Sequence, residues 1–268
     1  MRTNRGRLLG LTYYIILALF LHLPIVLLIV FSFNDSTLLV FPLKGFTLDW
    51  YRELLGAREL IEAARNSLIV GLVSSLLATV LGAMAGIAIA RFKFPLRDLF
   101  LNISTLPLVI PYVVLGVAML ILFRALGIEL SLWTITIGHT IINIPYVMLI
   151  IAARLSGFAD NLEEAAMDLG ATYWGTLMRV TVPISMPALL AAFLSSFTLS
   201  FDEFSLAFFL AGTQNTLPVY LYSQLRFPSR LPLAITTASV VILISLLILL
   251  ISEWLRRAGQ RAPSKVEG

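Results

Sequence analysis

Charged residues are scarce in this 268-residue sequence, at 13%, whereas hydrophobic residues make up 59%. A soluble domain carries about twice that share of charge, so the composition excludes an ordinary soluble protein. Cysteine is absent, which excludes disulfide bonds and thiolate chemistry. Because only two histidines accompany this lack of cysteine, no metal site is evident in the sequence.

Several enzyme signatures are also missing. No GxxxxGK[ST] phosphate-binding loop occurs, so this chain is not itself an ATPase of that type. The sequence shows no recognisable Ser-His-Asp arrangement and no HExxH motif, and we predict no catalytic residue. An integral-membrane enzyme is therefore the weaker class. A secondary transporter is a second alternative, although it would need ion-coupling carboxylates and usually an internal repeat, and no convincing repeat is visible.

What the sequence has in abundance is long apolar segments. A helix needs about 20 apolar residues to cross a bilayer, and the first segment is too long for a signal peptide. The sequence predicts an all-α membrane protein, a single domain over residues 1–268 with six transmembrane helices. The expected helices lie at residues 8–33, 66–90, 98–123, 132–153, 184–211 and 233–255.

Some residues inside these segments have specific expected roles. Pro107 and Pro111 should break the third segment, giving either a simple kink or a bend that lines a substrate path. His139 and Asn143 are expected to bond neighbouring helices. Small residues in the second segment suit close helix packing; the glycines among them are Gly71, Gly82 and Gly86.

The basic residues are distributed unevenly between the two sides of the membrane. Six helices place both chain ends on one side, where the flanking segments hold 12 Lys and Arg residues, against 7 on the other side. The positive-inside rule therefore predicts that both termini, and the connection at residues 154–183, are cytoplasmic.

That connection has the pattern of a helix–turn–helix outside the lipid. Asp160 can cap a first helix with Glu163 at the spacing of a capping box, Gly170 can end it, and Thr172 can cap a second helix. The first helix has one apolar stripe, formed by Leu162, Ala165, Ala166 and Leu169. On physical grounds alone, this is either an ordinary surface helix or a docking element.

The same segment resembles the EAA loop of bacterial ATP-binding-cassette (ABC) importer permeases. The family pattern is EAA, three residues, Gly, nine residues, then aliphatic-x-aliphatic-Pro, and the sequence from Glu164 to Pro183 matches that spacing in full. The resemblance implies a type I (MetI-like) importer permease whose loop docks on a separate ATPase. It implies coupling roles for Glu163, Glu164, Ala165, Ala166, Asp168, Leu169 and Gly170.

Further motifs resemble the second permease of spermidine/putrescine-type importers. They are FSFND at residues 31–35, NSL at 66–68, ARF at 90–92 and SFDEF at 200–204. The resemblance implies a multi-pass protein of the bacterial inner membrane. Its partners would be a second homologous permease, two ATPase subunits that bind ATP and Mg, and a periplasmic binding protein. No cofactor is expected in this chain and no nucleic acid among its partners.

Two carboxylates inside the fifth expected helix are the candidates for substrate contact. Inserting Asp202 or Glu203 at the centre of a transmembrane helix costs about 2.5–3.5 kcal/mol each on insertion scales. Because such residues are expensive inside a span, we expect these two to have a functional role. With Phe201 and Phe204 beside them, they suit an organic cation such as a polyamine. Alternatively, they pair with a basic residue of a partner subunit.

One departure from the family pattern bears on the substrate. Many members have an acidic residue after the second proline of the third span, whereas here Tyr112 follows Pro111. Tyr112 is thus a further substrate-path candidate. An amino-acid-like or opine-like substrate is the alternative to a polyamine.

Overall fold

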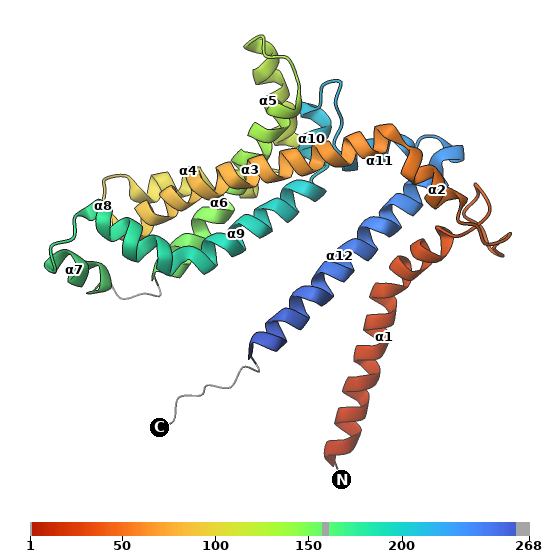
Figure 1. The fold of residues 1–268 in the computed structure, drawn as a ribbon, viewed down its shortest axis with the longest axis horizontal. Helices are drawn as coiled ribbons and strands as arrows, with labels where there is room; N and C mark the ends of the chain where they lie inside the picture. Colours follow the sequence, from red (N-terminus) through yellow and green to blue (C-terminus); the bar gives the residue numbers. More distant parts are fainter. Residues whose placement is uncertain (1, 157–160, 261–268) are drawn as a thin grey trace. The chain divides into compact units, whose positions relative to one another are not determined.

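The computed structural model describes residues 2–156 and 161–260, and within them the regular secondary structure is helical apart from one isolated β-bridge (Figure 1). The chain divides into two compact units, which we describe separately. The first unit joins Met1–Arg58 to Leu221–Gly268, and the second is Glu59–Tyr220.

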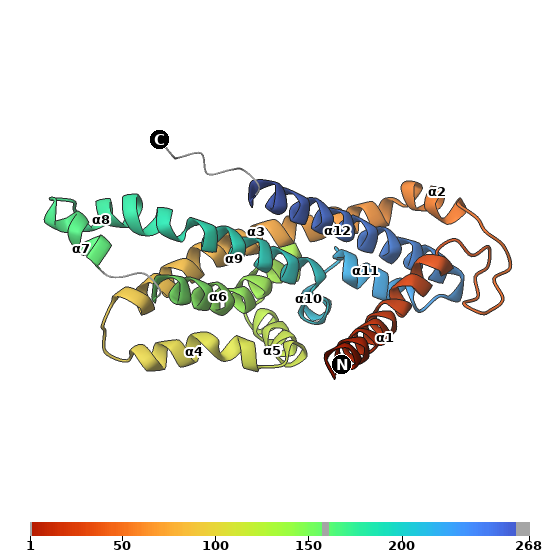
Figure 2. The ribbon, with the colours of Figure 1, turned by 90° about the horizontal axis from the view of Figure 1, so that it is seen from below.

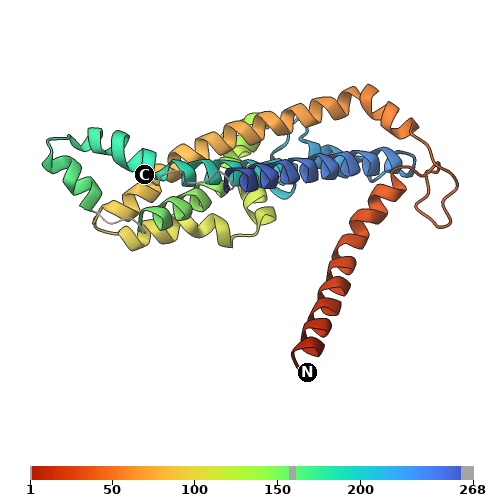
Figure 3. The ribbon, with the colours of Figure 1, turned by 60° about the horizontal axis from the view of Figure 1, so that its bottom comes forward.

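The first unit is built from helices at both ends of the chain. It contains α1 (Arg2–Phe31), α2 (Asp49–Gly56), a 3₁₀ turn at Pro228–Arg230 and α12 (Leu231–Gln260). Helix α12 contacts both α1 and α2. Figures 1 and 3 show α1 and α12 close together at the ends next to α2 and diverging from there.

The FSFND segment organises the connection between α1 and α2. Ser32 and Asn34 are buried, at 0% and 1% exposure. The Ser32 hydroxyl lies 2.7 Å from the Tyr51 hydroxyl, and the Trp50 indole donates to the Asn34 carbonyl at 3.0 Å. These polar residues therefore hold the loop against α2, because their buried groups find partners there.

The second unit contains the remaining helices. In chain order they are α3 (Arg58–Arg91), α4 (Arg97–Val109), α5 (Tyr112–Ala125), α6 (Leu132–Ser156), α7 (Asn161–Asp168), α8 (Tyr173–Thr176), a π-helix η1 (Leu177–Thr181), α9 (Val182–Asp202), α10 (Ser205–Leu210) and the first half of α11 (Leu217–Gln224), whose residues from Leu221 on belong to the first unit. Figure 2 shows α7 and α8 at the end of α9 that is remote from α10. One hydrophobic cluster joins α5, α6 and α10, and another joins α3, α6 and α9.

Glycines allow α3 and α6 to approach closely, as the sequence predicted. A Cβ added at Gly82 would lie 2.8 Å from the Ile144 carbonyl oxygen, and one at Gly86 would lie 2.7 Å from that of Met148. Since a backbone carbonyl cannot rotate away as a flexible side chain can, these two positions require glycine.

The third expected segment forms two helices instead of one. Helices α4 and α5 meet at an angle of 104°, and Figure 1 shows α5 rising steeply from the end of α4. Ile110 is extended, at φ −74° and ψ 128°, because the following Pro111 disfavours the helical conformation of the residue before it. The proline pair thus sets the position of the break.

The described residues contain four helices long and apolar enough to span a membrane, or five if α4 and α5 form one bent span. The four lie in α1, α3, α6 and the continuous segment from α8 through α9. Helix α12 covers the sixth expected span, but the apolar helical segment described there, Pro228–Ile244, which includes the 3₁₀ turn, is too short to count as one of the four. The all-helical class is therefore confirmed, and the count of six stays a prediction.

Candidate functional site

The fifth expected segment breaks at the carboxylates that the sequence singled out. Helix α9 ends at Asp202, Glu203 is extended at ψ 118°, and α10 begins two residues later. The Glu203 carboxylate accepts hydrogen bonds from the backbone N–H groups of Leu206, at 2.9 and 3.1 Å, and Ala207, at 2.9 Å. It therefore satisfies N–H groups that would be left without partners at the start of α10.

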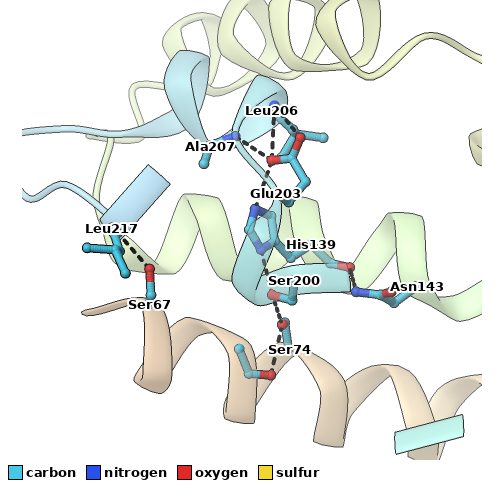
Figure 4. Close-up of polar contacts among 10 residues, drawn as sticks. Ser67, Ser74, His139, Asn143, Ser200, Glu203, Leu206, Ala207 and Leu217 are labelled. Atoms are coloured by element: carbon cyan, nitrogen blue, oxygen red, sulfur yellow. Dashed lines mark hydrogen bonds and ion pairs between the residues drawn. The ribbon is translucent and has the colours of Figure 1, made fainter. Parts of the chain in front are cut away.

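Glu203 also ends a chain of buried polar groups that crosses three helices (Figure 4). Its Oε2 lies 3.2 Å from Nε2 of His139, although the alignment of this pair is poor for a hydrogen bond. Nδ1 of His139 lies 2.6 Å from the Ser200 hydroxyl, which lies 2.9 Å from that of Ser74. The chain runs from α3 through α9 and α6 to the break.

One arrangement of protons is consistent with all of these contacts. A carboxylate only accepts, so Nε2 of His139 carries a proton toward Glu203, and Nδ1 of the neutral ring accepts from Ser200. Ser200 then accepts from Ser74. This arrangement is an assignment from the network of distances, and in it the carboxylate is stabilised by hydrogen-bond donors and not by an opposite charge.

Ser200, His139 and Glu203 share the chemical order of a hydrolytic triad, which the sequence did not reveal. The Ser200 side chain is only 3% exposed, and its hydroxyl is enclosed between His139 and Ser74. An acyl substrate cannot approach this oxygen, so the geometry supports a structural role for the set.

The two adjacent carboxylates have different surroundings. Glu203 is 7% exposed, whereas Asp202 is exposed. Phe201 and Phe204 are half-buried, and Phe204 and Tyr112 pack against the cluster of α5, α6 and α10. Only Asp202 is thus accessible as a partner for a cation while the contacts of Glu203 hold.

The connection between α6 and α9 has the expected helix–turn–helix form. At the end of α7, Gly170 takes φ +88°, the N–H of Gly170 donates to Met167, and the N–H of Ala171 donates to Ala166. This Schellman motif needs a residue with positive φ, which favours glycine. The Thr172 hydroxyl caps α8 by accepting from Gly175; Asp160, the expected cap of the first helix, lies outside the described residues.

Several large apolar side chains of this connection are exposed. Leu169 is 90% exposed and Trp174 is 66% exposed. Exposed large apolar side chains also include Leu162, Met167, Tyr173 and Met178. Tyr173, Trp174 and Met178 belong to the candidate span that begins at Tyr173, so their exposure suits contact with lipid, whereas Leu162, Met167 and Leu169 precede that span and suit contact with another protein. Of the polar residues predicted there, Glu164 and Asp168 are exposed as well.

Glu163 behaves differently from its neighbours. Its Oε1 accepts from Nε of Arg91 at 3.1 Å and from the Thr181 hydroxyl at 2.8 Å. The carboxylate therefore points toward the rest of the second unit. Beside it lies an open groove of about 880 Å³ between α7 and the α3–α4 connection; among its lining residues are Phe92, Lys93, Phe94, Glu164, Met167 and Tyr173.

These features can be compared with those of known proteins. The family described as binding-protein-dependent transport system inner membrane component matches residues 78–260, a range that includes the α7–α9 connection and the break at Glu203. This chain belongs to that family. It is therefore a transport component of the inner membrane, as the EAA spacing predicted.

Relatives with assigned names match over most of the chain. The spermidine/putrescine transport system permease protein PotC of Escherichia coli (strain K12) is 32% identical over 253 residues, which cover 94% of this chain and 95% of PotC. The putrescine transport system permease protein PotI of the same strain is 35% identical over 215 residues, covering 77% and 76%.

A solved structure supports the fold. The crystal structure of a bacterial alginate ABC transporter, in complex with an alginate pentasaccharide-bound periplasmic protein, contains a chain that matches with a TM-score of 0.73. The match covers 97% of this chain and 96% of that chain at 17% identity. The fold is therefore that of an ABC importer permease.

Sequence reasoning missed two pairings that the structure brings together. His139 meets Glu203, and Arg91 meets Glu163. A usable signal existed for the first pair, because ionisable residues within spans tend to pair with one another. The second pair joins residues at the ends of expected segments, 72 positions apart, where no local pattern links them.

Proposed function

We propose that this chain is a permease subunit of an ATP-driven importer for a small organic cation of the polyamine class. The observation that carries the substrate class is the similarity, over 94% of the chain, to a permease named for spermidine and putrescine transport. Asp202, exposed beside the aromatic side chain of Phe201, offers a carboxylate for an ammonium group and a ring for a cation–π contact.

In this proposal, the substrate path is lined by residues at the α9–α10 break and the start of α5. Asp202 contacts the cation, and Phe201, Phe204 and Tyr112 line the path beside it. Glu203 holds the break in shape through its contacts with α10 and His139. The 104° bend between α4 and α5 places the first turn of α5 against the same hydrophobic cluster as Phe204.

The proposed driving force comes from other subunits. ATP and Mg bind two ATPase subunits, whose closure moves the connection between α6 and α9. Its exposed apolar residues suit a docking surface, and Leu169 at the end of α7 is the most exposed of them. A second homologous permease completes the path, and a periplasmic binding protein delivers the substrate. Both termini of this chain are cytoplasmic.

The test is uptake by the reconstituted complex. The chain is co-expressed with a partner permease, an ATPase and a binding protein of the same transport system and placed in proteoliposomes. We expect ATP-dependent uptake of labelled putrescine or spermidine that excess unlabelled polyamine suppresses. ATP-independent uptake would instead support a secondary transporter.

A second substrate class has one specific observation in its favour. The family resemblance implies an acidic residue at the position that Tyr112 occupies here, and without it the path has one negative charge fewer for a multiply charged substrate. The uptake assay therefore includes amino-acid-like and opine-like monocations. Uptake of these, with no uptake of polyamines, would replace the polyamine assignment and leave the importer assignment intact.

A further inference from the structure

Glu163 and Glu164 are adjacent in α7 but face different surroundings. Glu164 is exposed, whereas the side chain of Glu163 is 18% exposed and that of its partner Arg91 is 12% exposed. Thr181, the second partner, is 3% exposed. The acidic residue of the EAA motif is Glu164, so the buried contacts belong to the residue just before the motif.

A single carboxylate oxygen of Glu163 connects three structural elements. Glu163 lies in the first turn of α7, Arg91 is the last residue of α3, and Thr181 is the last residue of η1, directly before α9. Oε1 accepts from both Arg91 and Thr181. Any displacement of α7 must therefore move both neighbours or break one of these bonds.

The element that Glu163 holds is a helical segment with irregular hydrogen bonding. Residues Leu177–Thr181 form a π-helix, and the N–H of Val182 donates to the carbonyl of Leu177, five residues earlier. Pro183 follows and has no N–H to donate, so the bond that this position would make to the carbonyl four residues earlier is missing. Segments of this kind inside α-helices are frequent at functional sites.

We propose that Glu163 is a positioning residue that passes the displacement of α7 to α3 and α9, while the exposed residues of α7 dock on the ATPase. The inference rests on the proposed function. It assigns docking and transmission to different side chains of one short helix. Loss of Glu163 then leaves the ATPase bound and active, but fewer substrate molecules are imported per ATP hydrolysed.

The experiment measures substrate molecules imported per ATP hydrolysed, in proteoliposomes holding equal amounts of assembled complex. In Glu163→Ala we expect this ratio to fall about tenfold or more, which corresponds to ~1.4 kcal/mol of lost coupling. Retention of the ATPase subunits should be unchanged. Glu163→Gln should retain more of the ratio, because its amide oxygen can still accept from both partners.

Further variants separate transmission from stability. Thr181→Val, which removes one of the two bonds and keeps the shape, should lower the ratio by an intermediate amount. The exchange of charges in Glu163→Arg with Arg91→Glu should recover part of the ratio lost in either single variant. A matched control is Asp49→Asn, which removes an exposed ion pair with Arg52, 2.9 Å apart on α2; it should leave the ratio unchanged.

The outcomes can be told apart from failure of the proposed function. Gly170→Asp alters the exposed turn at φ +88° and should release the ATPase subunits. If it does not, the docking assignment itself fails. Suppose that Gly170→Asp does release the ATPase subunits. The transmission role of Glu163 is then wrong if Glu163→Ala also releases the ATPase subunits, or if Glu163→Ala imports the normal number of substrate molecules per ATP hydrolysed. If the Glu163→Ala complex does not assemble, the other two variants decide. A normal number of substrate molecules per ATP in both Glu163→Gln and Thr181→Val would overturn the transmission role.

Discussion

Asp202 and Glu203 are adjacent, and the structure predicts opposite consequences for removing their charges. Glu203→Gln keeps the size of the side chain but replaces an acceptor-only group with an amide. The two backbone N–H donors of α10 and Nε2 of His139 then face a group without negative charge. Asp202→Asn changes an exposed side chain with no such set of partners.

The magnitudes follow from burial. Glu203 is 7% exposed, and hydrogen bonds to a buried charged group contribute about 1.5–3 kcal/mol, so Glu203→Gln should destabilise the complex by about that amount. An exposed substitution such as Asp202→Asn changes stability by less than about 0.5 kcal/mol. If Asp202 faces the cation, however, its loss should weaken substrate affinity by about 2–5 kcal/mol, or some 30- to 5000-fold.

Two measurements on the same preparations separate the effects. The yield and thermal stability of the assembled complex should fall for Glu203→Gln, and uptake per assembled complex should fall for Asp202→Asn. His139→Asn removes the other half of the pair, so the double variant with Glu203→Gln should cost less than the sum of the singles. A stable Glu203→Gln complex with selective loss of cation uptake would refute this reasoning and place Glu203 in the substrate path.

Two further predictions concern packing and topology. Gly86→Ala should destabilise the purified complex by about 1–3 kcal/mol in thermal unfolding, because its Cβ would lie 2.7 Å from a backbone carbonyl of α6. Gly71→Ala is the control, because its Cβ would lie 3.0 Å from a phenylalanine ring of α9, which can move, and near no backbone atom of another helix. An equal loss of thermal stability in both variants would show that contact with the backbone carbonyl is not the cause. Cysteine at Thr37 or Gln214 should react with an impermeant thiol reagent added outside cells, and cysteine at Lys93 should not; the parent chain has no cysteine. The opposite labelling pattern would invert the topology.

Local rules were sufficient for the connection between α6 and α9. Gly170 and Thr172 were expected to end one helix and cap the next, and both do so, because a Schellman turn and an N-cap depend only on residues a few positions apart. The family followed from the same segment, since the EAA spacing is a local pattern.

Local rules also located the break between α4 and α5, but not its angle. Pro111 forces Ile110 out of the helical conformation whatever surrounds it, so the position of the break follows from the sequence. The 104° between the two helices depends on what each packs against. The break at Glu203 carries no proline or glycine, and the apolar run continues through it, so the sequence predicted one helix where there are two.

By itself the sequence determined that this chain is helical, lies in a membrane and presents an EAA connection, because hydropathy and short-range spacing carry that information. Only the tertiary structure distinguished Asp202 from Glu203, and Glu163 from Glu164. Each pair has the same charge and adjacent positions, so no pattern along the chain separates its members. In the folded chain His139 contacts Glu203 and Arg91 contacts Glu163, although these partners are far apart in the sequence. Glu203 and Glu163 are therefore largely buried, whereas Asp202 and Glu164 are exposed.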